Sequence, residues 1–263
     1  MRWRQGVLNA FQAVFLVAWS MFWISLALIL SVLTLNRSLP LAMARRCWAP
    51  GLIWGAGVRL RVEPLPRVDW SAPHIFVMNH ESMIDIPIAF AVLPPNIRFV
   101  AKKVLKYVPF LGWYMWLTGM VFVDRTNRSQ ATGSLTKAGA QIRNGATILA
   151  YPEGTRSVDG TILPFKKGPF VVALAAGVPV IPVAISGSGR VLPSGGFSLR
   201  AGEIRVKIGA PIETLGRPPG DREALLREVR SAVIALHREI GGAGGDDEAI
   251  AAPGVEGRAV RRG

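Results

Sequence analysis

Residues 74 to 87 read His74-Ile-Phe-Val-Met-Asn-His-Glu-Ser-Met-Ile-Asp-Ile-Pro87, and they join an apolar run to a polar turn. The run that ends at Met78 is continuously apolar, which is typical of a strand covered by helices on both faces. Polar residues follow at once, from Asn79 to Ser82. Because α/β proteins place their sites at strand ends, this stretch predicts both an α/β fold and the position of a site.

His80 and Asp85 are the candidate catalytic pair in this stretch. On one regular helix, residues five apart would point roughly 140° away from each other. They can meet only if His80 lies in the turn before a helix and Asp85 lies near its start, which Pro87 supports. Asp85 would then orient the imidazole, whose other nitrogen could take a proton from an attacking hydroxyl. The alternative is a plain helix cap, because Ser82 and Asp85 have the spacing of a capping box.

The chain after Val58 alternates short apolar runs with helical patterns. Most of the runs are continuous, which indicates burial on both faces. The alternation predicts a single α/β domain whose mostly buried mixed sheet is flanked by helices. The predicted strands are Arg59–Val62, His74–Met78, Ile97–Ala101, Met120–Val123, Thr147–Tyr151, Val180–Ile185 and Ile204–Ile208, and the predicted helices are Ile86–Leu93, Ser129–Arg143, Pro169–Ala176 and Asp221–Ile240.

Positive charges gather near the ends of several predicted strands. Arg125 closes the run Gly119-Met-Val-Phe-Val-Asp-Arg125, and Arg156 lies in Ala150-Tyr-Pro-Glu-Gly-Thr-Arg-Ser157. Each charge taken alone is an ordinary surface residue. Together they suit a phosphate monoester, which arginine binds through two parallel hydrogen bonds. Further cations close to strand ends or loops are Lys102, Lys103, Lys166 and Lys167.

The composition combines hydrophobicity with positive charge. Of 263 residues half are hydrophobic, the mean hydropathy is +0.33 and the formal net charge is +14. Nucleic-acid binders are usually basic but polar, whereas this combination suits an anionic bilayer surface. The single cysteine, Cys47, excludes an internal disulfide, and three scattered histidines predict no metal site. The chain also lacks the G-x-S-x-G elbow and the phosphate-binding loop of nucleotide hydrolases.

The first 58 residues predict a membrane anchor. Ala10–Leu35 is a run of 26 residues without a charge, enough to cross a hydrocarbon core of about 30 Å and too long for a signal peptide. A second apolar stretch, Cys47–Val58, has 12 residues and is too short to span. Two topologies fit: a spanning helix followed by a surface helix, or a helical hairpin within one leaflet. Residues 59–240 then form the α/β domain, and residues 241–263 are predicted to be a disordered tail.

From about Ile75 to Ile185, the sequence resembles the glycerolphosphate acyltransferase superfamily, specifically the bacterial 1-acyl-glycerol-3-phosphate acyltransferases. Four blocks carry the resemblance in the family's order and spacing. Asn79-His80-x-x-x-x-Asp85 matches its His-x4-Asp block and Gly119–Arg125 its second block. Pro152-Glu-Gly-Thr-Arg-Ser157 matches the third block and Val178-Pro-Val-Ile-Pro-Val183 the fourth.

The resemblance implies a role for each matching residue. His80 would be the general base and Asp85 its orienting partner, with direct attack of the hydroxyl on a thioester and no acyl-enzyme. The acceptor's phosphate would be bound by Arg125, Arg156 and, as a third cation, Lys103 or its neighbour Lys102. The substrate pocket would be shaped by Glu153, Gly154 and Thr155. Val178–Val183 would form a buried strand near the acyl tunnel, and no metal or prosthetic group would be needed.

The implied reaction makes phosphatidic acid for phospholipid biosynthesis. Acyl-CoA or acyl carrier protein would donate the acyl group to the sn-2 hydroxyl of 1-acyl-glycerol-3-phosphate, at the cytoplasmic face of the inner membrane. Basic residues would attract both the anionic lipid and an acidic carrier protein. A different acceptor, such as lyso-ornithine lipid, remains open. Alternatives of other classes are a non-catalytic lipid-binding scaffold and, on charge alone, a nucleic-acid-binding protein.

Overall fold

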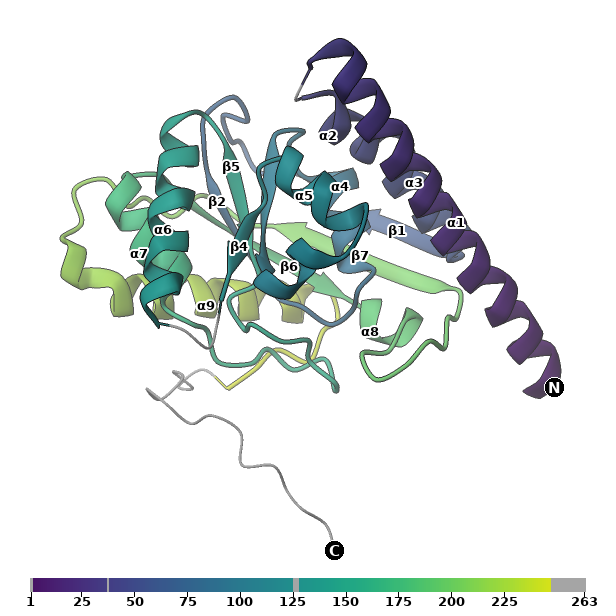
Figure 1. Ribbon diagram of the computed structural model, residues 1–263. Helices are drawn as coiled ribbons and strands as arrows, with labels where there is room; N and C mark the ends of the chain where they lie inside the picture. The colour runs from purple at the N-terminus through teal and green to yellow at the C-terminus, as the bar shows by residue number, and fades with distance from the viewer. Residues whose placement is uncertain (1, 37, 125–127, 247–263) are drawn as a thin grey trace, which may run out of the picture.

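The computed structural model describes residues 2–36, 38–124 and 128–246 of the chain. Within these residues, seven strands form one mixed sheet in the order β1-β7-β6-β2-β5-β3-β4 (Figure 1). Only β6 and β7 pair antiparallel; the other neighbours are parallel. All seven predicted strands are present: β1 Val58–Val62, β2 Ile75–Met78, β3 Ile97–Lys102, β4 Val121–Val123, β5 Thr147–Ala150, β6 Val180–Ser186 and β7 Gly202–Ile208.

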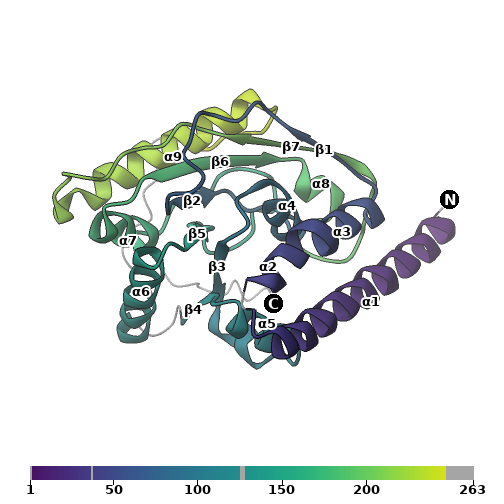
Figure 2. The same cartoon turned by 90° about the horizontal axis from the view of Figure 1, so that it is seen from above.

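Strand β2 is buried on both faces, as its continuous apolar run predicts. Phe76 and Met78 pack into one hydrophobic cluster, while Ile75 and Val77 pack into the other, because alternate side chains of a strand point to opposite faces. The four predicted helices are confirmed as α4 Asp85–Val92, α6 Arg128–Arg143, α7 Gly168–Ala176 and α9 Arg222–Glu239. Helices α6, α7 and α9 cover one face of the sheet, and α4 with the N-terminal helices covers the other (Figure 2).

The parallel pairing of β2 with β5 fixes the place of the site. Val77 lies beside Ala150 in the register, so the two strands end at the same edge of the sheet. The turn that contains His80 therefore emerges next to the segment that begins at Tyr151. Strands β3 and β4 run in the same direction and bring Lys102 and Val123 to that edge.

The N-terminal region forms two helical segments packed side by side. Helix α1 (Arg2–Thr34) runs along a second segment made of α2 (Leu39–Met43), a π-helical turn η1 (Ala44–Trp48) and α3 (Ala49–Gly55) (Figure 2). The Trp19 indole N–H donates to the Trp48 carbonyl oxygen at 3.0 Å. The second segment begins at Leu39, eight residues before the predicted Cys47, because Pro40 is tolerated in a first helical turn. Within α1, Gly6–Thr34 is long and apolar enough to cross a membrane.

Four short helices were not predicted: η2 Lys103–Tyr107, α5 Leu111–Leu117, α8 Ser188–Val191 and η3 Pro219–Asp221. They are held by tertiary contacts rather than by a long helical pattern of their own. Helix α5 contacts α1 and leaves Trp113 and Trp116 largely exposed.

Residues 241–246 differ from the disorder predicted for the whole tail. The Ile162 N–H donates to the Gly244 carbonyl oxygen at 2.7 Å, and the Arg238 guanidinium donates to the Gly245 carbonyl oxygen at 3.1 Å. The prediction is therefore wrong for these six residues, because glycines at this position permit close packing against the domain. The remaining predicted tail, 247–263, lies outside the described residues.

Candidate active site

His80 and Asp85 meet in the arrangement that their spacing requires. His80 lies in the turn after β2, and Asp85 is the first residue of α4. The His80 Nδ1 and Asp85 Oδ2 atoms are 2.7 Å apart, and the Asp85 side chain is fully buried. The Asp85 carboxylate accepts a hydrogen bond from the His80 Nδ1–H group. The neutral imidazole therefore carries its proton on Nδ1 and leaves Nε2 free to accept another proton.

Asp85 also supports the turn before α4, although the helix itself has Ile84 at its N-cap position and no side-chain cap hydrogen bond. The Asp85 Oδ2 atom accepts the backbone N–H groups of Glu81 and Ser82, both at 2.9 Å. One buried oxygen therefore closes the turn before α4 and orients the imidazole. The two roles are compatible, since the same turn brings all three donors to the carboxylate.

The turn that carries His80 is fixed from the neighbouring strands. The Asn79 side chain donates to the Ile185 carbonyl at 2.9 Å and accepts the Ile185 N–H at 2.8 Å, which extends the pairing of β2 with β6. The His80 N–H donates to Glu153 Oε1 at 2.7 Å, and the His80 carbonyl accepts the Ser157 N–H at 2.8 Å. These bonds leave the imidazole little freedom to move, because its backbone is held on both sides.

Tyr151 is a site residue that the sequence did not single out. Its ring stacks on the His80 imidazole, with centroids 4.1 Å apart and planes inclined by 22°. Burial raises the pKa of the Tyr151 hydroxyl well above its ordinary value, so the ring remains neutral. The only sequence signal for Tyr151 was its place at the end of a predicted strand, directly before Pro152. A neutral aromatic face also favours an imidazolium beside it.

His80 faces an apolar cavity of about 830 Å³. The lining is mostly hydrophobic and comes from α1, the second N-terminal segment, α4, β3, η2 and α5. Its polar members include His80, Lys102, Thr155 and Arg156. Within the described part of the chain, Val178–Val183 contributes no lining residue. The segment forms most of β6, which is buried between β7 and β2 as predicted, whereas its nearness to an acyl tunnel stays a prediction.

The predicted phosphate-binding cations are only partly brought together. Arg156 lines the cavity beside Gly154 and Thr155. Of the two neighbouring lysines Lys102 lines the cavity, whereas Lys103 forms an ion pair with Asp124 at 3.2 Å. The predicted contact of Lys103 or Lys102 with the acceptor's phosphate stays a prediction. Arg125 lies outside the described residues.

Comparisons with known proteins assign this site to a family. Residues 59–186 match the acyltransferase family. Human 1-acyl-sn-glycerol-3-phosphate acyltransferase alpha is 31% identical over 73% of this chain and 69% of its own length. The chain belongs to the acyltransferase family. The Saccharomyces cerevisiae 1-acyl-sn-glycerol-3-phosphate acyltransferase is 36% identical over 64% of this chain, and the match spans 57% of that relative's length.

A solved acyltransferase has the same architecture. The Thermotoga maritima 1-acyl-sn-glycerophosphate (LPA) acyltransferase, PlsC, superimposes with a TM-score of 0.77 at 27% sequence identity. The superposition covers 90% of this chain and 97% of the PlsC chain. The likeness therefore includes N-terminal helices that precede the segment matched to the acyltransferase family. Together with the apolar helix α1, the family indicates association with a membrane.

Glu153 acts on the backbone rather than from the cavity wall. Its side chain is buried, and its two oxygens accept the N–H groups of His80 at 2.7 Å and Leu163 at 3.0 Å. Burial, the main cause, raises the pKa of Glu153 to about 8. The expected contribution of Glu153 to the pocket is therefore indirect: it positions the turn that carries His80.

The raised pKa of Glu153 predicts that the free energy of unfolding falls as the pH rises. The folded-state pKa of about 8 exceeds the ordinary 4.5, so between these values the folded protein binds more protons than the unfolded chain. The resulting stabilisation of the fold is complete below pH 4.5 and is lost as the pH rises through the folded-state pKa of about 8. We expect the Tm in detergent to fall between about pH 5 and 8 more for the wild type than for Glu153→Gln. The same change of Tm with pH in the wild type and in Glu153→Gln would contradict the raised pKa of Glu153.

Proposed function

We propose that the chain transfers a fatty acyl group from acyl-CoA or acyl carrier protein to the sn-2 hydroxyl of 1-acyl-glycerol-3-phosphate, which forms phosphatidic acid. The observation that carries the proposal is the His80–Asp85 pair, 2.7 Å apart, at an apolar cavity whose lining also contains Arg156. The names of the human and Thermotoga maritima relatives support the same acceptor.

The proposed chemistry is one direct acyl transfer. His80 Nε2 takes the proton of the acceptor hydroxyl while the oxygen attacks the thioester carbonyl carbon. The ionised Asp85 stabilises the imidazolium that forms. The tetrahedral intermediate then breaks its carbon–sulfur bond, and the thiol leaves with the proton from His80. The products are an ester and a free thiol, and the sequence of steps uses no metal or prosthetic group.

Arg156 is the proposed ligand of the acceptor's phosphate. We expect Arg156→Ala to raise the KM for lysophosphatidic acid about 10- to 100-fold, as expected for the loss of a charge-assisted hydrogen bond. Transfer to a monoacylglycerol, which lacks the phosphate, should change much less. Arg200→Ala is the matched control, because Arg200 is exposed and outside the described cavity lining. An unchanged KM for lysophosphatidic acid in Arg156→Ala would contradict the proposed contact.

Competition between acceptors tests the proposed substrate. Purified protein in detergent would receive labelled acyl-CoA or acyl carrier protein together with lysophosphatidic acid and lyso-ornithine lipid. The proposal predicts labelled phosphatidic acid as the main product. Product from lyso-ornithine lipid alone would keep the chemistry and replace the acceptor. Absence of transfer with every pair would instead support a lipid-binding scaffold.

The proposed location is the cytoplasmic face of the inner membrane, where both acyl donors are present. The outer surface of α1 supports contact with lipid, because Phe11, Val14 and Val32 are each about 70% exposed and apolar. The net charge of +14 would attract anionic lipid and an acidic carrier protein. Protease accessibility of the α/β domain in right-side-out and inverted membrane vesicles tests the orientation.

A further inference from the structure

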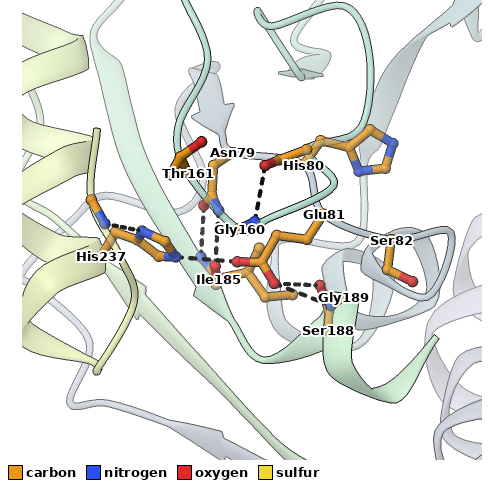
Figure 3. A network of polar contacts seen from close by, with 12 residues as sticks. Asn79, His80, Glu81, Ser82, Gly160, Thr161, Ile185, Ser188, Gly189 and His237 are labelled. Atoms are coloured by element: carbon orange, nitrogen blue, oxygen red, sulfur yellow. Dashed lines mark hydrogen bonds and ion pairs between the residues drawn. The ribbon is translucent and has the colours of Figure 1, made fainter. Parts of the chain in front are cut away.

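Glu81 follows His80 directly and points away from it into the protein (Figure 3). Its side chain is buried, and both carboxylate oxygens have partners. Oε2 accepts the Gly189 N–H at 3.1 Å and the Ser188 hydroxyl at 3.4 Å, both in α8. Oε1 lies 3.1 Å from Nε2 of His237, which comes from the last turns of α9. The catalytic turn is thus attached to two helices that follow the segment matched to the acyltransferase family.

The contacts of His237 define which of its nitrogens carries the proton. The imidazole is fully buried, and its Nδ1 accepts the Gly244 N–H at 3.1 Å. A nitrogen that accepts a hydrogen bond carries no proton, so the ring is neutral and Nε2–H donates to Glu81. The direction of each hydrogen bond from Gly244 through His237 to Glu81 is therefore fixed.

The segment after α9 is shaped to hold this imidazole. A Cβ atom at Gly242 would lie 2.2 Å from His237 Nε2, so only glycine permits the observed approach. Gly244 has a φ of +76°, which favours glycine and directs its N–H to His237. The Gly244 carbonyl also accepts the Ile162 N–H, which ties the segment to the loop that follows Arg156.

We propose that Glu81 and His237 are positioning residues for the acyl-transfer reaction: their hydrogen bond, completed by Gly244, holds the His80 turn in its reactive geometry from the C-terminal side. This inference rests on the proposed function. Glu81 is directly linked to the catalytic pair. Its backbone N–H donates to Asp85 Oδ2, which is the oxygen that orients His80. A shift of Glu81 would therefore move both members of the catalytic pair.

Glu81→Gln tests the pair with almost no change in shape. The amide of Gln has one acceptor, whereas His237 Nε2–H and the Gly189 N–H both require one. His237 cannot change its protonated nitrogen without losing the bond from Gly244. In either amide orientation two donors therefore face each other, and the turn must shift. A displacement of this kind costs up to about 100-fold in rate when it moves reacting groups by about 1 Å.

A second substitution restores the pattern of donors and acceptors. In Glu81→Gln with His237→Glu, the Gln carbonyl accepts the Gly189 N–H and its amide donates to the new carboxylate. The second carboxylate oxygen accepts the Gly244 N–H in place of His237 Nδ1. The single variant His237→Glu places two carboxylates face to face in a buried site, which is unfavourable.

The experiment measures kcat and KM for acceptor and donor, with Tm in the same detergent. We expect Glu81→Gln to lower kcat about tenfold or more with KM values near those of the wild type. The double variant should recover most of that loss. Glu239→Gln removes a carboxylate from the same helix, where its partner Lys207 lies outside the catalytic turn, and should keep wild-type kcat.

Wild-type kcat in Glu81→Gln would overturn the positioning role. A loss of activity that matches the loss of folded protein, with normal kcat per folded molecule, would overturn it as well. The same would follow if the folded double variant were no better than Glu81→Gln. Failure of the proposed function is distinguishable, because the wild-type protein would then transfer no acyl group to lysophosphatidic acid in the same assay.

Discussion

The His80→Ala variant is expected to lose acyl transfer by about 10³-fold or more, because it removes the proposed general base. His80 Nε2 is the atom placed to take the acceptor proton, since Asp85 holds the proton on Nδ1. The binding sites for both substrates remain, so the loss should fall on kcat with little change in KM. Initial rates over a range of lysophosphatidic acid concentrations measure the two parameters separately.

The fold of the His80 variant is the necessary control. The imidazole stacks on Tyr151, so its removal leaves a gap beside a buried ring. His80→Gln fills most of that gap without supplying a base, and its Tm in detergent should lie close to that of the wild type. Substantial transfer by either variant, at more than a tenth of the wild-type kcat, would exclude His80 as the base.

The Asp85→Asn variant is expected to reduce kcat by up to about 10⁴-fold, the loss seen when an orienting carboxylate of this kind becomes an amide. The amide oxygen can still accept hydrogen bonds from the N–H groups of Glu81 and Ser82, so the turn before α4 keeps both bonds. What is lost is the charge that stabilises the imidazolium. A kcat near that of the wild type in this variant would contradict the role of Asp85.

Asp85→Ala separates the support of the turn before α4 from the catalytic role. Alanine removes the acceptor of two backbone N–H groups in the buried turn, at about 1–3 kcal/mol for each unsatisfied group. We therefore expect a clearly lower Tm for Asp85→Ala than for Asp85→Asn, with both variants strongly impaired in kcat. Equal Tm values for the two variants would show that the carboxylate does not support the turn.

The sequence predicted the parts of the site that depend on local geometry. His80 and Asp85 are five residues apart, and the turn before a helix is the only arrangement that joins them. The strands were predictable for a related reason, since burial on both faces leaves continuous apolar runs such as Ile75–Met78. Local patterns were sufficient because neither feature depends on how distant segments pack.

The remaining features depend on contacts between distant residues. Glu81 and His237 are 156 positions apart, and no pattern in either segment indicates that they meet. Tyr151 reaches His80 only because β2 and β5 pair in parallel. For Lys102 and Lys103, the side that each faces depends on how β3 ends, which the family's block spacing does not specify.

Acyl transfer to lysophosphatidic acid is tested by the product of the purified wild-type protein incubated with acyl-CoA and 1-acyl-glycerol-3-phosphate. Mass spectrometry of the lipid, with enzymatic release of the sn-2 chain, identifies the ester that was formed. The proposed reaction yields phosphatidic acid that carries the donor's chain at sn-2, together with one free thiol for each ester. Unchanged lysophosphatidic acid beside a slowly hydrolysed donor, with the folded protein present, would contradict it.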